Sequence, residues 1–316
     1  MIYKNSLKIM MSNFVLVTRL LVLMLVAGIV LFGLFYLLAY PVINVLELQG
    51  WFAAIGDIHY SFLQTFNLSE AINELGYELF NFFGIIGNNF RSLAFNVISL
   101  ILLIILTLAF LGNFYDVAVS NSLYHGMSNN TKVKLLPSMI STFRNNMKYN
   151  LLSLVAKLPV KLGIFAIIVY LMNVVRFSGG WAIFAPFVIL LAYLILKAFE
   201  LVLFAGWVPA VVVFDKGVVS AFEKGIKVNT RNFVKMYANS FYIILTIVVI
   251  NVVVGVATFG VGLIVTIPAS ILLRNSFAMV VFYSNYGMRY YVDESNVIVP
   301  AKLEQTDRAR ALKYKI

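Results

Sequence analysis

The sequence predicts an all-α polytopic integral membrane protein, a helical bundle with about six transmembrane helices. Apolar residues make up 62% of the 316 residues and charged residues only 12%, whereas a soluble domain carries about 25% charged residues. Six segments are long and apolar enough to cross a bilayer, which takes about 20 residues. Lys and Arg gather between alternate segments, as the positive-inside rule expects.

The six predicted spans are distributed along the whole chain. They comprise residues 14–40, 93–114, 151–175, 181–213, 241–259 and 261–283. The connections 176–180 and 258–262 are short, so spans three and four, and spans five and six, are expected to form hairpins. The fourth span is longer than a bilayer needs and must tilt, kink or protrude. In the third span, Lys157 and Lys161 are expected to extend their ammonium groups toward the cytoplasm.

The distribution of charge predicts the orientation. Neither Lys nor Arg occurs between Arg19 and Arg91, and this interval holds five acidic residues. The loops after the second and fourth spans and the tail 291–316 are basic. We therefore expect a multi-pass protein of the cell membrane, with both termini in the cytoplasm and residues 41–90 outside. The run 14–40 is too long for a signal-peptide core and is expected to remain as a span.

The outer insertion 41–90 carries a further helical pattern. Its helix is expected to start with Ser69 as the N-cap and to lie along the outer membrane surface, with Trp51 and Phe52 upstream as interfacial anchors. Acidic residues recur every four positions and form an outer acidic face of Glu70, Glu74 and Glu78. This face is most simply solvated, and the alternative is a docking surface for a basic extracytoplasmic partner.

A repeated motif divides the chain into three units. Residues 115–131 match residues 214–230 at a constant offset of 99 residues, which aligns Asp116 with Asp215. The N-terminus carries a weaker copy of the same motif. We predict three pseudo-repeated hairpins within a single membrane domain, each preceded by an inner amphipathic helix. The units comprise residues 1–115, 116–214 and 215–290.

The clearest copy of the motif lies in residues 208–234. It reads VPAVVVFD, a Gly, SAFEKGIK, and then RNF at the entry of the next span. This pattern resembles the glycerophosphodiester phosphodiesterase membrane-domain superfamily and related bacterial integral membrane proteins. The resemblance covers residues 207–283 well and the middle unit moderately, and it implies a six-helix membrane domain without a catalytic motif. The 316 residues include no soluble phosphodiesterase domain, so the resemblance does not imply that activity.

Charged residues inside the predicted spans form the first candidate site. Lys197 and Glu200 lie in the fourth span, and Arg274 and Asn275 lie in the sixth. A charge at bilayer depth costs about 3 kcal/mol on insertion scales and needs a partner or water. The structural interpretation is an ion pair of Glu200 with Arg274 or with Lys197. The functional interpretation is a polar cavity for a lipid headgroup or an ion.

A second candidate site lies at the cytoplasmic ends of the second and fourth spans, at Asp116 and Asp215. Each is expected to cap the following helix by accepting hydrogen bonds from its free N–H groups. The alternative is a pseudo-symmetric carboxylate pair that binds a cation or a basic partner segment.

An inner basic face lies after Asp215 in the sequence. It is expected to rest on anionic lipid of the inner leaflet or to dock a cytoplasmic protein. Its residues are Lys224, Lys227, Arg231 and Lys235.

Sequence motifs of metal or nucleophilic chemistry are absent. The chain has no Cys, and the predicted topology places His59 and His125 on opposite sides of the membrane. The sequence contains no HExxH, P-loop or GxSxG motif, which are the patterns that carry zinc hydrolysis, phosphate binding and serine nucleophiles. We therefore expect no metal, cofactor or catalytic residue. The basic charge is already explained by topology, so we expect no nucleic-acid partner.

These observations define the expected function. The first hypothesis is a non-enzymatic integral membrane protein that supports transport or envelope assembly by binding lipid or a partner protein. The second is a transporter or channel for a small solute or lipid that uses the polar intramembrane site. The third is a lipid-modifying enzyme. The three hypotheses differ in what the charged residues of the fourth and sixth spans do.

Overall fold

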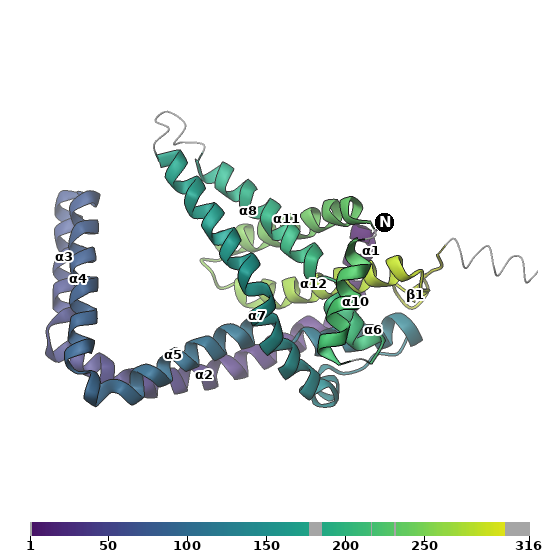
Figure 1. The fold of residues 1–316 in the computed structure, drawn as a ribbon, viewed down its shortest axis with the longest axis horizontal. Helices are drawn as coiled ribbons and strands as arrows, with labels where there is room; N and C mark the ends of the chain where they lie inside the picture. Colours follow the sequence, from purple (N-terminus) through teal and green to yellow (C-terminus); the bar gives the residue numbers. More distant parts are fainter. Residues whose placement is uncertain (1, 177–184, 216, 231, 301–316) are drawn as a thin grey trace, which may run out of the picture. The chain divides into compact units, whose positions relative to one another are not determined.

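The computed structural model describes residues 2–176, 185–215, 217–230 and 232–300. Within them the chain is almost entirely helical and ends in a two-stranded antiparallel ribbon (Figure 1). The elements are α1 (Ile2–Ser12), α2 (Val15–Leu48), α3 (Trp51–Thr65), α4 (Leu68–Asn88), α5 (Phe90–Asn113), α6 (Asp116–Asn129), α7 (Leu135–Arg176), α8 (Ala185–Phe204), α9 (Trp207–Val213), α10 (Val218–Thr230), α11 (Phe233–Ala257), α12 (Leu263–Tyr286), β1 (Tyr290–Tyr291) and β2 (Val297–Ile298).

The apolar helices confirm an all-α protein with several candidate membrane spans. Five helices of the described chain are long and apolar enough to cross a membrane. They are Val15–Leu48, Leu135–Val174, Pro186–Val213, Phe233–Ala257 and Leu263–Tyr286. Of the predicted second span, the stretch up to Ile105 qualifies together with α4, as a pair that bends by 113° at the junction of α4 and α5. The described helices therefore provide five spans, or six if this bent pair is one span.

The helix starts differ from the predicted span starts. Helix α7 begins at Leu135, well before the predicted position 151, and α11 begins at Phe233 instead of 241. Hydropathy locates the part of a helix that fits lipid, whereas the helix itself extends until a cap or a turn ends it. The additional turns of α7 carry buried polar residues, among them Ser138, whose Oγ donates to the Ala118 carbonyl oxygen of α6 at 2.7 Å, and Asn146. Burial of one face therefore stabilises these turns, although their sequence is too polar for a span.

The overlong fourth span is broken. Helix α8 ends at Phe204 and α9 begins at Trp207, whereas the predicted start at 181 lies outside the described residues. At the break, Gly206 meets Gly225 of α10 so closely that a Cβ on Gly206 would lie 2.5 Å from the Gly225 carbonyl oxygen. Any side chain at either position would therefore push the two backbones apart.

The chain divides into two compact units. Unit 1 comprises residues 1–23 and 112–316, and unit 2 comprises residues 24–111. In unit 2, α3 and α4 pack as an antiparallel hairpin, and the Trp51 indole N–H donates to the Glu78 carbonyl oxygen at 3.0 Å. A separate apolar cluster is formed by Val42, Leu46, Ile85 and Leu93.

Two details of unit 2 correct the sequence predictions. The N-cap of α4 is Asn67, whose side chain accepts from the Glu70 N–H, and not Ser69. Glu70 and Glu74 are exposed, but Glu78 is buried, and its carboxylate accepts from Asn81. The three acidic residues therefore do not form one continuous solvated face, because the turn at Glu78 packs against Trp51 of the neighbouring helix.

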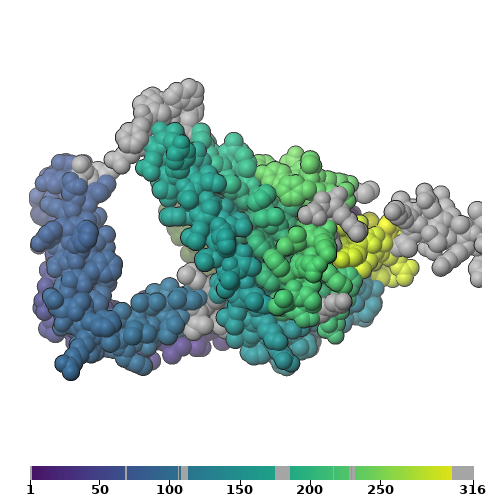
Figure 2. All heavy atoms as spheres, in the orientation of Figure 1, coloured from purple at the N-terminus to yellow at the C-terminus, as the bar shows by residue number. Residues whose placement is uncertain are grey.

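Helix α12 is the centre of unit 1. About two thirds of the most apolar 18-residue stretch of α12 is buried. The helix contacts α1, α6, α9, α10 and α11. Helix α1 is held on it through Asn5, which donates to the Tyr290 hydroxyl at 2.9 Å just beyond the end of α12. In the space-filling view, α7 (teal) and α10 (green) form one continuous face of this unit (Figure 2).

The short helices of unit 1 have different environments. Helix α6 is buried over most of its first two turns, from Asp116 to Leu123, so these turns do not lie exposed on a membrane surface. Helix α10 buries only one face, which contains Val218, Ala221 and Gly225. A short helix precedes a long one three times, at α1–α2, α6–α7 and α10–α11. The three-unit repeat nevertheless stays a prediction, because element order alone does not establish equivalence.

Candidate functional site

A polar cavity lies inside unit 1, among apolar helices. It has a volume of about 130 Å³ and is lined by side chains from α6, α7, α8, α9, α11 and α12. Its polar lining consists of Asp116, Tyr149, Lys157, Lys197, Glu200, Arg274 and Asn275. Its apolar lining consists of Leu201, Phe204, Ala205, Val208, Ile244 and Ala278. The four candidates that the sequence placed inside the spans therefore meet at one cavity, together with Asp116.

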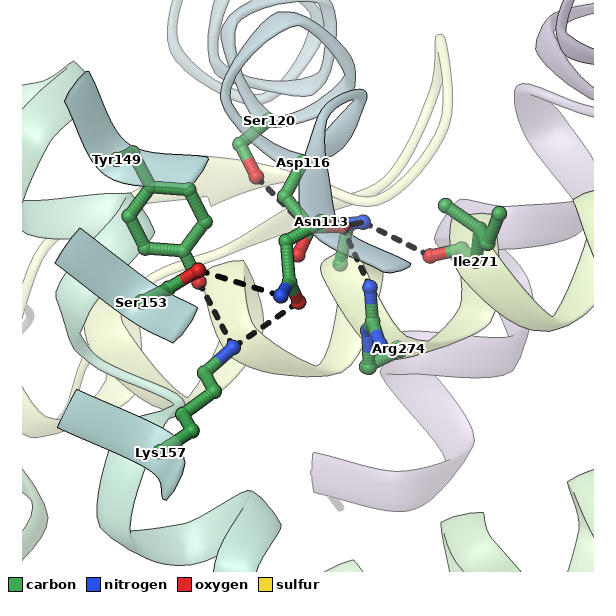
Figure 3. Close-up of polar contacts among 9 residues, drawn as sticks. Asn113, Asp116, Ser120, Tyr149, Ser153, Lys157, Ile271 and Arg274 are labelled. Atoms are coloured by element: carbon green, nitrogen blue, oxygen red, sulfur yellow. Dashed lines mark hydrogen bonds and ion pairs between the residues drawn. The ribbon is translucent and has the colours of Figure 1, made fainter. Parts of the chain in front are cut away.

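Asp116 anchors the first half of the polar lining. Its Oδ1 accepts from Arg274 Nη2 at 2.6 Å and from Asn275 Nδ2 at 2.9 Å (Figure 3). The Asn275 side chain is fixed in turn, because its Oδ1 accepts from Ser120 Oγ at 3.1 Å and its Nδ2 also donates to the Ile271 carbonyl oxygen. These bonds join the start of α6 to the middle of α12 through one buried carboxylate.

The predicted role of Asp116 as a cap is wrong. The N-cap of α6 is Tyr115, which makes no side-chain cap bond, and Asp116 is the first helical residue. Its position still suits a carboxylate, because the N-terminus of a helix carries partial positive charge. Asp215, its partner in the sequence repeat, is exposed and has a left-handed backbone with φ of 47°. The two residues therefore do not form a pair of equivalent acids, since one is buried in an ion pair and the other lies on the surface.

Lys157 anchors the second half of the polar lining. Its side chain does not extend toward the cytoplasm as predicted but is buried, with 8% exposure. Its Nζ donates to Asn113 Oδ1 and to the Tyr149 hydroxyl, both at 3.1 Å (Figure 3). The Asn113 amide donates in turn to Ser153 Oγ at 3.2 Å. Lys161, one turn further along α7, is exposed.

Lys197 and Glu200 pair within α8. Lys197 Nζ lies 2.7 Å from Glu200 Oε2, so the predicted pairing of Glu200 with Lys197 is confirmed. The alternative pairing of Glu200 with Arg274 is wrong, because Arg274 pairs with Asp116 at 2.6 Å. The Lys197 and Arg274 side chains keep 28% and 32% of their exposure. Two of the cations that line the cavity are therefore partly accessible at the surface of unit 1.

Sequence reasoning missed Asn113 and Tyr149 and misread Lys157. A signal for this face of the cavity does exist in α7. Four polar residues follow one another at spacings of four, three and four, and all of them are buried. They are Asn146, Asn150, Ser153 and Lys157. This spacing places them on one helix face, and a buried polar stripe on an apolar helix indicates a polar interior.

The predicted inner basic face is only partly assembled. Lys227 is exposed and pairs with Glu223, whose hydrogen bond raises the pKa of Lys227. Lys235 is exposed on α11, and Lys224 lies over the Phe214 ring at 5.0 Å. Arg231 lies outside the described residues. These side chains therefore stay candidates for contact with anionic lipid and do not contribute to the cavity.

A second, larger hollow lies at the edge of unit 1, between α1, α6 and the ribbon. It measures about 330 Å³ and is lined among others by Asn13, Lys132 and Asp293. Hydrogen bonds from the Asn296 side chain and the Ser295 backbone lower the pKa of Asp293 to about 2. Lys132 pairs with Glu294 at 2.6 Å on the exposed surface. This hollow contains ordinary surface pairs, whereas the smaller cavity holds charges among apolar helices.

The donor set of the smaller cavity favours binding over metal chemistry. Within the described ranges, no group of three or more His, Cys, Asp or Glu side chains could hold a metal ion. Three cations against two carboxylates leave one positive charge in excess around the cavity. The cavity can therefore accept one anionic group beside an apolar wall. Comparison of the chain with protein-family models, curated proteins and solved structures finds no match.

Proposed function

We propose that this chain is a non-enzymatic integral membrane protein that binds a lipid at the polar cavity of unit 1, and that it supports transport or envelope assembly in this way. The observation that carries the proposal is a cavity lined by five charged side chains among helices apolar enough to span a membrane. Ionisable residues inside membrane helices are costly, so they are rare and usually mark binding sites or pathways.

The lining of the cavity suits an amphiphile. Charged groups occupy one part of it, and Leu201, Phe204 and Ile244 supply an apolar wall. Pockets for drug-sized ligands measure about 300–1,000 Å³, whereas this cavity measures about 130 Å³. The site is therefore large enough for a small polar group only, and the acyl chains of a bound lipid would extend along the apolar surface of unit 1.

The proposal includes the topology that the charge distribution predicts. Both termini lie in the cytoplasm of a cell-membrane protein, and residues 41–90 lie outside. Termini on one side require an even number of crossings, so the bent α4–α5 pair would supply the sixth crossing through α5, with α4 outside. We further propose that α1–α2, α6–α7 and α10–α11 begin three related units. The resemblance to the glycerophosphodiester phosphodiesterase membrane domain supports a six-helix architecture of this kind.

Retention of lipid by the purified protein tests the function. The full chain is solubilised in mild detergent, and its bound lipids are identified by native mass spectrometry. Ile244→Trp narrows the cavity from α11, and Ile250→Trp makes the same change at an exposed position of the same helix. We expect wild type and Ile250→Trp to retain phospholipid and Ile244→Trp to lose it. Equal retention by both variants, or none by wild type, would contradict the proposal.

A transporter is the second candidate, and the partial exposure of Lys197 and Arg274 favours it. Both side chains line the cavity and are partly exposed, and charged residues inside membrane helices commonly mark substrate and ion pathways. Reconstituted protein would then carry a solute across vesicle membranes, and Glu200→Gln would slow that flux by breaking the pair with Lys197. Binding of lipid without any flux of lipid or solute would favour the first function.

A further inference from the structure

The positive charge in excess around the cavity can be assigned to one residue. Arg274 pairs with Asp116, and Lys197 pairs with Glu200. Over the part of the chain that the structure describes, Lys157 is the lining cation with no carboxylate oxygen within 4.0 Å of its nitrogen. An ammonium group in a low-dielectric interior normally has an anionic partner close by. Lys157 is therefore the cation of this site whose anionic partner the described residues do not supply.

The hydrogen bonds of Lys157 also leave capacity for a ligand. A lysine ammonium group has three N–H donors, and the described residues supply two acceptors, the Asn113 side-chain oxygen and the Tyr149 hydroxyl. Both acceptors are neutral, so neither balances the charge. The Phe204 ring lies 5.7 Å from Nζ and adds a weaker attraction, because an aromatic face is electron-rich.

The neighbours of Lys157 hold it in place. The Tyr149 ring is fully buried and packs edge-on against Trp207 with ring centres 5.0 Å apart. The Asn113 side chain is fixed by Ser153 Oγ. The ammonium group is therefore positioned before any ligand arrives, which reduces the entropy that a binding site loses when it closes around its ligand.

We propose that Lys157 is the anion-binding residue of the cavity and that it binds the phosphodiester group of an anionic lipid. This inference rests on the proposed function, since it names the ligand class of the same site. Both carboxylates of the cavity are already paired, so the ammonium group of a zwitterionic headgroup would find no free acid there. A phosphodiester in an uncharged glycerol headgroup brings one negative charge and matches the one positive charge in excess. The cavity of about 130 Å³ admits a group of this size.

Lipid selectivity of the full chain tests this assignment. Native mass spectrometry would compare wild type, Lys157→Met and Lys161→Met, each incubated with phosphatidylglycerol, phosphatidylcholine or inorganic phosphate. Lys161 is the matched control, because it is exposed one turn further along α7. We expect wild type and Lys161→Met to prefer phosphatidylglycerol by at least about tenfold, the size of one charge-assisted hydrogen bond. Lys157→Met should abolish that preference, so that it binds phosphatidylglycerol and phosphatidylcholine about equally.

Circular dichroism and size-exclusion chromatography would verify that Lys157→Met folds, and Lys157→Gln, which keeps a hydrogen-bond donor without the charge, provides a second variant. A preference that survives in a folded Lys157→Met or Lys157→Gln protein overturns the assignment. Equal binding of both lipids by wild type, blocked by Ile244→Trp, overturns the assignment but leaves the lipid-binding function. Binding of inorganic phosphate alone, lost in Lys157→Met, supports the anion site and rejects a lipid as its ligand. Binding of neither lipid nor phosphate by wild type overturns both.

Discussion

The Arg274 guanidinium donates to the Asp116 carboxylate at 2.6 Å, which joins two residues that are 158 positions apart in the sequence. This bond connects the first turn of α6 with the middle of α12, the most buried of the candidate spans. Asp116 also accepts from Asn275. The same carboxylate therefore orders one wall of the polar cavity and links α6 to α12, so the candidate site and the packing of α6 share this interaction.

Removal of the Asp116 charge should destabilise the protein strongly. Loss of one member of a buried ion pair costs about 3–5 kcal/mol. Because Arg274 is partly exposed, we expect Asp116→Asn to lower the free energy of unfolding by about 3 kcal/mol. Asp215→Asn is the matched control, because Asp215 occupies the aligned position of the repeat but is exposed, and it should change stability by less than about 0.5 kcal/mol. The free energy of unfolding in mixed micelles measures both. Equal effects of the two substitutions would mean that the ion pair contributes nothing particular to the fold.

The contact between Gly206 and Gly225 should tolerate no side chain. A Cβ on Gly225 would lie 2.7 Å from the Trp207 backbone nitrogen, so Gly225→Ala must separate α9 from α10 and should cost at least about 1–3 kcal/mol. Gly163→Ala is the control within α7, where a new Cβ meets no atom within 4 Å. It should be neutral or stabilising by about 0.5–1 kcal/mol. Thermal unfolding of the two variants measures the difference, and a Gly225→Ala protein as stable as wild type would show that the helices do not approach so closely.

Labelling of single cysteines should establish the number of crossings. The chain has no native Cys, so Glu74→Cys and Lys227→Cys each create one reactive site on an exposed position. We expect a membrane-impermeant maleimide to label position 74 in intact cells. It should label position 227 only after the membrane is permeabilised. A cysteine near the C-terminus should behave like position 227, because six crossings return the chain to the cytoplasm. Labelling of the C-terminal position from outside would indicate five crossings and a bent α4–α5 pair that does not span.

Asp293 should titrate at an unusually low pH. Donors from Asn296 and Ser295 favour its charged form and lower its pKa from 3.8 to about 2. Because this pKa is lower in the folded protein, the contribution of Asp293 to the stability of the β1–β2 turn is complete above about pH 4 and is lost as the pH falls through 2. Carbon-13 NMR of labelled Asp carboxyl groups measures the midpoint, with Asp293→Asn to assign the signal. A midpoint near 3.8 would show that the turn does not hold the carboxylate.

The sequence was sufficient to predict the apolar helices, because a span is a local property of about 20 consecutive residues. It also brought Lys197, Glu200 and Arg274 to attention, because charges are conspicuous in such helices. The partner of Arg274 could not be predicted in the same way. A charged group at bilayer depth needs a partner, but the nearest acid in the fold is Asp116, which the sequence places at a helix end far along the chain. Pairing between distant segments depends on how the helices pack, and helix packing is not encoded in local hydropathy.

The sequence repeat explains a second error. Asp116 and Asp215 share a local pattern, which predicts equal roles for them, yet Asp116 is buried and Asp215 is exposed. Local sequence determines where a short helix starts, whereas tertiary packing decides which of its faces is covered. The prediction that Lys157 extends toward the cytoplasm is wrong for the same reason. A lysine near a helix end can reach water only if no neighbouring helix covers that face, and the polar stripe of α7 is covered.

Photocrosslinking of a bound phospholipid tests the central claim most directly. Phosphatidylglycerol with a photoreactive group at its headgroup is incorporated with the full chain, irradiated, and mapped by peptide sequencing. We predict that crosslinks concentrate in the segments that line the cavity, near Tyr149 and Phe204, and that they are lost in Lys157→Met but not in Lys161→Met. Crosslinks spread evenly over the exposed apolar surface of the helices, unchanged by Lys157→Met, would contradict it.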